Sequence, residues 1–356
     1  MRVAILAPSR HPLREPFAGG QERLTADIAA GLRSRGHQVH LYARAGTDPA
    51  LADGLHPMAA TPPLSEIASG DLNMPEPRFL SDQVAFLGVM RDLLRNNNVD
   101  VVLNQSLHQL PLALSPALTV PMITTLHTPP FPWMEVGAWL AGSSGQFVAV
   151  SEALRAQWTT LVQAQVIHNG VDPQAFPEGP GGADLAWVGR LTQEKGADIA
   201  VRAAQHAGRY LRIAGPVSDP AWFDAVLRPR LGRSAEYVGT LSGRELARLY
   251  GSSSATLVTP LWEEPFCLVA AESQMCGTPI AGLRRGGLPE VVGTAGGHLV
   301  ADEDALADAV DIVVTMDRRD VAADARRRLS TGRMLDRYEE MLVELITPPI
   351  TSGTTH

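Results

Sequence analysis

The sequence is poor in lysine and cysteine and has no excess of positive charge. Its 356 residues include 30 basic and 38 acidic side chains, a net charge of −8, and Lys195 is the single lysine. A nucleic-acid-binding protein is not expected, because contacts to phosphate backbones require clustered positive charge. The only cysteines, Cys267 and Cys276, argue against a disulfide framework and against a cysteine-based metal site.

Long hydrophobic runs are also missing. No stretch approaches the roughly 18 apolar residues of a membrane span, and the apolar start of the chain is too short for a signal peptide. We therefore expect a cytoplasmic protein. Membrane contact is disfavoured by the acidic composition, and it stays open for a lipid-linked acceptor. With 45% hydrophobic and 19% charged residues, the composition is that of a folded globular protein, long enough for two domains.

Short β-rich segments alternate with longer amphipathic segments along the whole chain, which is typical of parallel sheets with crossover helices. In the first half we predict strands at 2–7, 38–43, 99–104, 121–126 and 146–150, and helices at 21–35, 80–97 and 151–162. In the second half we predict strands at 184–188, 210–214, 236–238, 255–259, 279–281 and 298–300, and helices at 195–207, 220–231, 243–250, 268–275 and 305–314. A Gly/Pro-rich linker at 177–182 separates the halves.

The pattern predicts two doubly wound, Rossmann-like α/β domains that face a central cleft, with a C-terminal helix crossing back. The N-terminal domain is expected to comprise 1–170 together with 334–347, and the second domain 171–333, followed by a disordered tail at 348–356. In such folds ligands bind outside the carboxyl ends of the strands.

A glycine-containing turn follows the first strand of each half. Gly19 and Gly20 precede a helix whose free N–H groups can hold an anion, although a plain turn explains two glycines equally well. In the second half, Gly189 is followed by Arg190 and Lys195. A guanidinium and an ammonium five residues apart at a strand end suit a diphosphate, and the alternative is a solvated surface pair.

The segment from Glu264 to Glu272 carries two carboxylates eight residues apart. Because Pro265 disfavours helix before it, we expect a helix to start near Phe266 and to leave three N–H groups free for a ligand, those of Phe266, Cys267 and Leu268. The two carboxylates can then hold hydroxyls at both ends of a nucleotide sugar, with phosphate on the amides between them. A salt-bridged glutamate is the ordinary alternative for Glu272.

His127 closes a strand and precedes a proline-stiffened loop, so it is placed at the carboxyl end of the sheet. A lone histidine is more often a structural hydrogen-bonding residue than a functional one. Asn104, at the end of the preceding predicted strand, and Trp133, beyond the proline loop, complete the expected acceptor site.

The sequence carries a set of motifs whose identity and order resemble those of the retaining GT-B glycosyltransferases of family 4. A weaker similarity is to the subgroup that includes avilamycin-type antibiotic transferases. The motifs are Gly19-Gly20-Gln21-Glu22, His127, Val150-Ser151-Glu152, Asn169-Gly170-Val171-Asp172, Gly189-Arg190-Leu191, Glu194-Lys195-Gly196, the E-x7-E segment Glu264 to Glu272, and Cys276-Gly277-Thr278-Pro279. Cys267 departs from the family pattern, which usually has glycine there.

The resemblance implies a role for each matching residue. Arg190 and Lys195 would bind the donor diphosphate and stabilise it as the leaving group, while Glu264 would bind the donor sugar. Glu272 would bind the ribose, and His127 would hydrogen-bond the donor sugar beside the acceptor. The remaining expected donor contacts are Gly19, Gly20, Gly189, Val238, Leu241, Phe266, Cys267 and Leu268.

The implied activity is retaining transfer of a sugar from a nucleotide-diphosphate donor to a hydroxyl acceptor. A UDP-sugar is favoured and a GDP-sugar comes next, and the acceptor is a small molecule, a saccharide or a lipid-linked compound. No metal or other cofactor is expected. Two alternatives stay open: a nucleotide-sugar 2-epimerase of the same architecture, and a non-catalytic two-lobed binding protein, which is typically exported.

Overall fold

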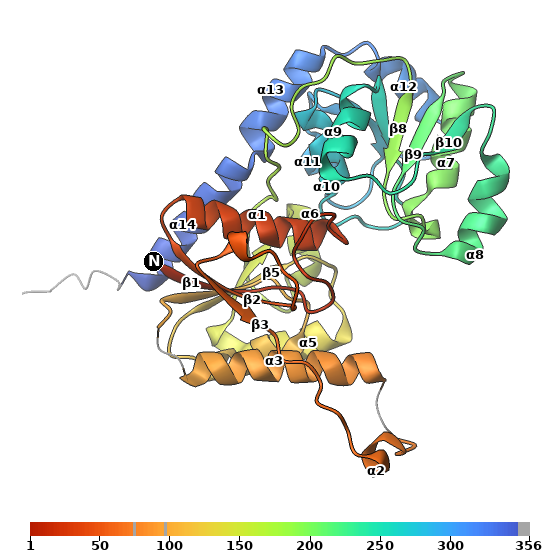
Figure 1. The fold of residues 1–356 in the computed structure, drawn as a ribbon. Helices are drawn as coiled ribbons and strands as arrows, with labels where there is room; N and C mark the ends of the chain where they lie inside the picture. The colour runs from red at the N-terminus through yellow and green to blue at the C-terminus, as the bar shows by residue number, and fades with distance from the viewer. Residues whose placement is uncertain (74–75, 96–97, 348–356) are drawn as a thin grey trace, which may run out of the picture. The chain divides into compact units, whose positions relative to one another are not determined.

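The computed structural model describes residues 1–73, 76–95 and 98–347, and the chain divides into two compact units (Figure 1). Unit 1 comprises Met1–Ala149, Gln157–Ile167 and the chain from Leu335 onward, and unit 2 comprises Val150–Ala156 and His168–Met334. The tail predicted at 348–356, and residues 96 and 97 of the helix predicted at 80–97, lie outside the described residues.

Unit 1 contains a parallel sheet of seven strands in the order β3-β2-β1-β4-β5-β6-β7. The strands are β1 (Arg2–Leu6), β2 (Gln38–Ala43), β3 (Gly54–Pro57), β4 (Val101–Asn104), β5 (Met122–Leu126), β6 (Gln146–Ala149) and β7 (Ala164–Val166). The central strands are mostly apolar and almost entirely buried, as expected for a sheet covered on both faces. Because every pairing is parallel, the carboxyl ends of these strands meet at one edge.

Helices cover both faces of this sheet, with α1 on one face and α3 and α5 on the other (Figure 1). The helices are α1 (Gly20–Ser34), α2 (Glu66–Ser69), α3 (Pro77–Arg95), α4 (Gln109–Leu114) and α5 (Pro132–Ala141), with the 3-10 turns η1 (Pro49–Leu51), η2 (Ser115–Ala117) and η3 (Gly142–Ser144). Two further helices, α6 (Glu152–Trp158) and α14 (Thr331–Ile346), belong partly to unit 1 and partly to unit 2. Among the described residues, none of these helices or those of unit 2 is long and apolar enough to cross a membrane.

The C-terminal helix α14 packs onto unit 1, as predicted for a helix that crosses back. Its buried residues recur on one face, at Leu335, Tyr338 and Leu342. The hydroxyl of Tyr338 lies 3.0 Å from that of Thr125 on β5, and an Arg35 Nη1–Asp336 contact of 2.7 Å ties the helix to the end of α1.

Unit 2 contains a parallel sheet of six strands in the order β10-β9-β8-β11-β12-β13. The strands are β8 (Leu185–Val188), β9 (Leu211–Ala214), β10 (Ala235–Tyr237), β11 (Ala255–Val258), β12 (Ile280–Leu283) and β13 (Gly297–Val300). The helices are α7 (Ala197–His206), α8 (Pro220–Trp222), α9 (Gly243–Gly251), α10 (Leu268–Met275), α11 (Leu288–Val292), α12 (Leu306–Val313) and α13 (Arg318–Leu329), with 3-10 turns η4 (Gln193–Lys195) and η6 (Arg228–Arg230) and a π-helical turn η5 (Phe223–Leu227).

The predicted α/β class and the two doubly wound sheets are confirmed, whereas several element predictions were wrong. Strands β3 and β7 and helices α2, α4, α5, α11 and α13 were not predicted. Strand β7 has only three residues and β3 only four, too few to show a period. The helix predicted at 220–231 is three short pieces. Pro229 lies in its last part, where a proline lacks the N–H that a continuous α-helix requires.

Val150–Ala156 belongs to unit 2, although the predicted boundary places it with residues 1–170. The Ser151 hydroxyl donates to the carbonyl of Pro265 at 2.6 Å. The N–H groups of Glu152 and Ala153 donate to the Glu290 carboxylate at 2.7 and 2.8 Å, which satisfies the open start of α6. These bonds explain why the segment joins unit 2.

Candidate functional site

The predicted site residues fall into two groups, one in each unit. Unit 1 holds Gly19, Gly20, Asn104, His127 and Trp133, and unit 2 holds Gly189, Arg190, Lys195, Val238, Leu241, Glu264, Phe266, Cys267, Leu268 and Glu272. Each group is described within its own unit.

In unit 2, a tight turn fixes Lys195 at the carboxyl end of β8. Lys195 lies in the 3-10 turn η4, and α7 starts only at Ala197, two residues later than predicted. The reason is Gly196, which adopts φ +67° and approaches β11 so closely that an added Cβ would lie 2.1 Å from the carbonyl oxygen of Thr259. The Thr259 hydroxyl donates to the carbonyl of Gly196 at 2.7 Å and completes the turn.

The turn brings the Lys195 ammonium against the Glu264 carboxylate. Nζ lies 2.8 Å from each carboxylate oxygen, and the two side chains are only 19% and 12% exposed. The ammonium also lies 5.1 Å from the centre of the Trp262 ring, within reach of a cation–π contact. Two residues predicted to bind different parts of the donor are therefore bonded to each other in this structure.

The loop carrying Glu264 is held by two neighbouring glycines. The N–H of Gly287 donates to the carbonyl of Glu264 at 2.7 Å, and that of Gly286 donates to the Glu263 carboxylate at 2.6 Å. Gly286 has φ +53°, and an added Cβ would lie 2.3 Å from the Glu264 carbonyl oxygen. The loop geometry thus depends on residues more than twenty positions further along the chain.

Cys267 precedes α10 with φ 80° and ψ 73°, the only non-glycine residue of positive φ in the described chain. The helix consequently begins at Leu268, which confirms the helix predicted at 268–275, two residues after the start near Phe266 that Pro265 suggested. Among the described hydrogen bonds, none uses the N–H groups of residues 266–268, so these donors face no protein acceptor. Burial raises the pKa of the Cys267 thiol to about 12, so it is a neutral side chain at physiological pH.

The positive φ of Cys267 predicts that a glycine variant is more stable than an alanine variant at this position. A Cβ at positive φ costs about 1–2 kcal/mol, and Ala retains that strain whereas Gly relieves it. We expect Cys267→Gly to be more stable than Cys267→Ala by about 1 kcal/mol in chemical denaturation. The matched pair Ser273→Gly and Ser273→Ala, in the middle of α10, should show the opposite order, and the same order at both positions would contradict strain at Cys267.

Glu272 lies eight residues after Glu264, in the second turn of α10, and is buried. It accepts a hydrogen bond of 3.1 Å from the hydroxyl of Tyr250 at the end of α9. Burial first, and then the neighbouring Glu272 carboxylate, raise the pKa of Tyr250 well above its usual value. Tyr250 is therefore a fixed donor that orients Glu272, a role that no local motif in the sequence indicates.

Arg190 is held much more loosely than Lys195. Its guanidinium is 52% exposed, and its contact with Glu194 is 3.4 Å long. An exposed pair of this length contributes little to stability. The guanidinium is consequently available to bind an anion.

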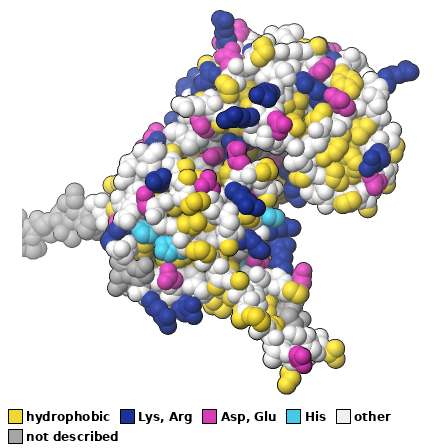
Figure 2. Space-filling view, viewed as in Figure 1, with side chains coloured by type: hydrophobic (Ala, Val, Ile, Leu, Met, Phe, Trp, Pro, Cys, Tyr) yellow, Lys and Arg dark blue, Asp and Glu magenta, His cyan; other side chains and the backbone are white. Residues whose placement is uncertain are grey.

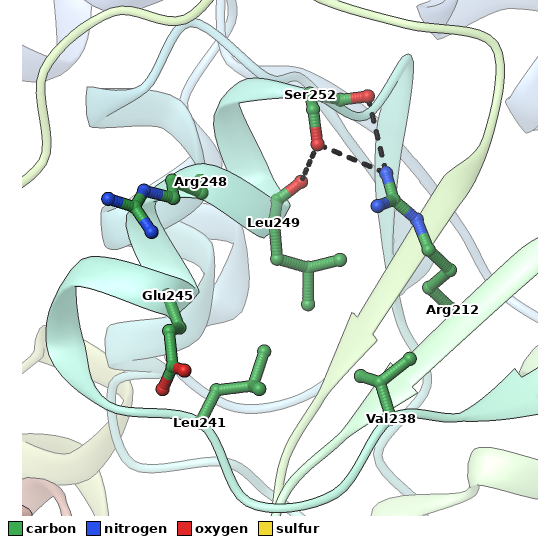
Figure 3. Close-up of a pocket in the computed structure, with 7 residues that line it drawn as sticks. All are labelled: Arg212, Val238, Leu241, Glu245, Arg248, Leu249 and Ser252. Atoms are coloured by element: carbon green, nitrogen blue, oxygen red, sulfur yellow. Dashed lines mark hydrogen bonds between the residues drawn. The ribbon is translucent and has the colours of Figure 1, made fainter.

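Val238 and Leu241 line a pocket of about 220 Å³ beside α9 (Figure 3). The other lining residues are Arg212, Glu245, Arg248, Leu249 and Ser252. Val238, Leu241 and Leu249 provide an apolar wall, and Arg212 is anchored through Nη2 to the carbonyl and hydroxyl of Ser252 at 3.4 and 3.1 Å. A pocket with an apolar wall and a few polar groups is typical of a small-molecule site.

In unit 1, α1 begins at Gly20, and its extended N-cap residue Gly19 provides no side-chain cap. Asn104 lies at the end of β4 and is fully buried. Its amide donates to the Thr124 hydroxyl at 3.2 Å and accepts from the N–H and hydroxyl of Ser106. The described contacts of Asn104 thus order the loop after β4, and an acceptor role for it stays a prediction.

His127 follows β5 and is joined to a hydrogen-bonded chain inside unit 1. Its Nε2 lies 2.9 Å from Oε1 of Gln105, whose amide nitrogen donates to the Thr125 hydroxyl at 2.9 Å. Thr125 in turn contacts Tyr338 of α14. Because the Gln105 oxygen can only accept, Nε2 of His127 must donate, which leaves Nδ1 of the neutral ring as an acceptor.

The neutral ring predicts a pH dependence. Burial lowers the pKa of His127 from 6.5 to about 4, so the unfolded chain binds a proton more readily than the folded protein between these pH values. Stability should therefore fall as the pH drops from 6.5 toward 4. In His127→Gln this fall in melting temperature should be shallower, and parallel profiles for the two proteins would contradict the assignment.

Trp133, in the first turn of α5, is 52% exposed. Its ring centre lies 5.9 Å from that of Phe79 in the first turn of α3.

Within the described ranges, no group of three or more His, Cys, Asp or Glu side chains is placed to hold a metal ion.

Comparison with known proteins identifies the family of this two-unit fold. The family model described as "Glycosyltransferase Family 4" matches residues 18–175, and the one described as "Glycosyl transferases group 1" matches residues 182–315. A D-inositol 3-phosphate glycosyltransferase of Mycolicibacterium paratuberculosis is 30% identical over 87% of this chain and 81% of that protein. The chain belongs to the GT-B glycosyltransferases of family 4.

Other similar proteins agree with this family 4 assignment. A glycogen synthase of Mycobacterium tuberculosis is 28% identical over 98% of this chain and 94% of that protein. The structure of AviGT4, a glycosyltransferase involved in avilamycin A biosynthesis, shares the fold with a TM-score of 0.71, 23% identity and coverage of 97% and 98% of the two chains. HepE of Anabaena, solved with UDP-glucose, shares it with a TM-score of 0.73, 17% identity and coverage of 97% and 100%.

This family 4 protein is a glycosyltransferase that uses a nucleotide-sugar donor, in agreement with the resemblance of its motifs. The predicted GT-B architecture is confirmed by the structural neighbours. The relatives named above are transferases or synthases, so the 2-epimerase alternative is not favoured.

Proposed function

We propose that this protein transfers a sugar from a UDP-sugar to a hydroxyl acceptor with retention of anomeric configuration, with unit 2 binding the donor. The observation that carries the proposal is the pairing of Lys195 with Glu264 directly before the open start of α10. It combines a cation for the phosphates with the segment that carries a carboxylate for sugar hydroxyls and free backbone N–H groups.

Positive charge at this place has a catalytic purpose. The barrier to transfer is the departure of UDP from the anomeric carbon, during which negative charge grows on the diphosphate. Lys195, the exposed guanidinium of Arg190 and the N–H groups of residues 266–268 are the groups that would stabilise it. Glu272, oriented by Tyr250, would hold the ribose hydroxyls.

Retention is proposed to occur by attack on the face from which UDP leaves. The bond between the anomeric carbon and the diphosphate oxygen breaks, the acceptor oxygen forms its bond on the same face, and the acceptor proton passes to the departing phosphate. Both oxygens of Glu264 are occupied by Lys195, which supports a sugar-binding role for this carboxylate over a nucleophilic one.

UDP is the proposed nucleotide because HepE, which shares the fold, was solved with UDP-glucose. The pocket beside Val238 and Leu241 is the proposed site of the base. The names of the relatives, a glycogen synthase and an inositol phosphate glycosyltransferase, favour an acceptor hydroxyl on a saccharide or a small polyol.

The proposal is tested first by ligand binding and then by product configuration. UDP should raise the melting temperature more than GDP, ADP or dTDP at equal concentration, since a ligand of the native state stabilises it by mass action. NMR of the product formed from UDP-α-glucose should show an α linkage. A β product would disprove retention, and conversion of the UDP-sugar alone into another UDP-sugar would identify an epimerase.

A further inference from the structure

Glu290 on α11 carries a largely buried carboxylate that the proposed function does not use. Acidic side chains are scattered over the face of the molecule drawn in Figure 2, but that of Glu290 is only 22% exposed. It accepts three hydrogen bonds, from the N–H groups of Glu152 and Ala153 at 2.7 and 2.8 Å and from Nε2 of His168 at 3.0 Å. An ionised carboxylate can only accept, so Nε2 of His168 carries a proton.

The three bonds favour the ionised form of Glu290 and join segments that are far apart in the chain. Burial by itself would raise the pKa of Glu290, but the bonds from the imidazole and the two N–H groups outweigh it, and this pKa lies below its usual value. The carboxylate links α11 to the start of α6 and to His168, across 122 to 138 positions. All of these segments belong to unit 2.

The start of α6 holds the carbonyl of Pro265 in the donor-site loop. Ser151, directly before the helix, donates its hydroxyl to that carbonyl at 2.6 Å and accepts from the N–H of Leu154 at 3.0 Å. Ser151 is fully buried, so both bonds are shielded from water. The position of Pro265 is therefore linked to that of α6, whose first N–H groups are bound by Glu290.

His168 and the turn before α11 contact the same loop. The ring centre of His168 lies 5.9 Å from that of Phe266. The N–H of Gly287, directly before α11, donates to the carbonyl of Glu264 at 2.7 Å. With the contact from α6, three consecutive residues of this loop are held by elements that Glu290 joins.

We propose that Glu290 is a positioning residue for sugar transfer, which fixes the loop 264–266 so that the Glu264 carboxylate and the N–H groups of residues 266–268 meet the donor. The inference rests on the proposed function, since it concerns the same donor site. Glu290 acts through the loop and not on the donor, because both of its oxygens accept hydrogen bonds from the protein. A shift of the loop by about 1 Å is enough to slow transfer by about 10²-fold.

Glu290→Gln removes the charge and one accepting oxygen, and its transfer rate at saturating UDP-sugar is expected to fall about 10- to 100-fold. UDP should still raise its melting temperature, since Lys195 is fixed by its own turn. When Glu290→Gln is combined with Glu264→Gln, the loss should be smaller than the product of the single losses, because Glu290 acts on the rate through the loop that carries Glu264. A combined loss equal to that product, or a wild-type rate in folded Glu290→Gln, would overturn the proposal.

The two cysteines report on the loop independently of activity. Cys267 directly follows the loop and Cys276 ends α10; both are buried, and burial raises the pKa of each thiol to about 12, so their chemistry is matched. With a thiol reagent and peptide mass spectrometry, we expect Cys267 to be labelled about tenfold faster in Glu290→Gln and Cys276 at its wild-type rate, since only the loop is released. Equal acceleration at both cysteines would mean a general loss of stability and would overturn the positioning role.

Asp53→Asn is the matched control. Asp53, in unit 1, is likewise a carboxylate that accepts from a backbone N–H, that of Val39 at 2.9 Å, and from a basic side chain, that of Arg33 at 3.0 Å. Its amide variant loses the same charge away from the loop. It should keep the wild-type transfer rate and the slow labelling of Cys267.

Ser151→Ala tests the same route should Glu290→Gln fail to fold, because it removes the bond to Pro265 and leaves Glu290 in place. It is expected to lower transfer about tenfold and to speed the labelling of Cys267. Wild-type values of both would overturn the proposal. Wild-type protein without a UDP-induced rise in melting temperature would contradict the proposed function instead, and the labelling of Cys267 would still decide whether Glu290 fixes the loop.

Discussion

Replacement of Lys195 by methionine is expected to reduce sugar transfer by about 10³-fold and to weaken UDP binding by about 10- to 100-fold. A charge-assisted hydrogen bond to a phosphate contributes about 1.5–3 kcal/mol to binding, which corresponds to the change in affinity. The effect on transfer is larger because negative charge on the diphosphate grows as UDP leaves. Isothermal titration with UDP and initial rates with a UDP-sugar measure the two effects.

The matched control is Arg228→Met. Arg228 also combines an ion pair, 2.7 Å to Asp224, with a ring contact, 4.9 Å from the guanidinium carbon to the centre of Phe223, but both members of its ion pair are exposed. This variant should keep wild-type transfer and UDP affinity. Unchanged UDP affinity in folded Lys195→Met would contradict the phosphate role of the ammonium.

The alternation of apolar and amphipathic segments was sufficient to predict both sheets apart from the short strands β3 and β7. Buried parallel strands are largely apolar, as in β4 with Val101, Val102 and Leu103, and such runs stand out between longer helical patterns. The prediction that the helix starts at Lys195 was wrong, because local propensity does not show that Gly196 packs against the carbonyl of Thr259. That approach depends on how β11 lies against β8 and is a property of the tertiary fold.

The candidate site was predictable as a list of residues but not as a set of contacts. The arginine-rich composition singled out Lys195, and the eight-residue spacing singled out Glu264 and Glu272, yet nothing local indicates that Lys195 and Glu264 bond to each other across 69 positions. Gln105, Thr125 and Tyr338 connect to His127 through bonds that span 20 to 213 positions, so only the folded chain reveals them.

The Lys195–Glu264 pair also has a consequence for donor binding. The diphosphate and the Glu264 carboxylate require the same ammonium, which already makes two bonds of 2.8 Å to the carboxylate in this structure. The ammonium has three N–H donors, so a diphosphate that binds Lys195 shares it with this carboxylate. Loss of the carboxylate charge should make the ammonium more available to UDP while removing the group proposed to bind the donor sugar.

Glu264→Gln is accordingly expected to bind UDP as tightly as the wild type or up to about tenfold more tightly, while transfer falls by at least about 10²-fold. Glu263→Gln is the matched control, since Glu263 is the neighbouring carboxylate and contacts the N–H of Gly286 instead of Lys195. It should retain most of the transfer activity.

A double-mutant cycle with Lys195→Met separates the two possible effects of Glu264 on UDP. If the carboxylate competes with the diphosphate, Glu264→Gln should change UDP affinity only while Lys195 is present, because the competition acts through the ammonium. UDP binding weakened more than tenfold in Glu264→Gln would mean instead that the carboxylate holds the ammonium in the position the phosphates need. Competition and positioning thus predict changes of opposite sign in the UDP affinity of Glu264→Gln. The transfer rate of the same variant tests separately whether the carboxylate binds the donor sugar.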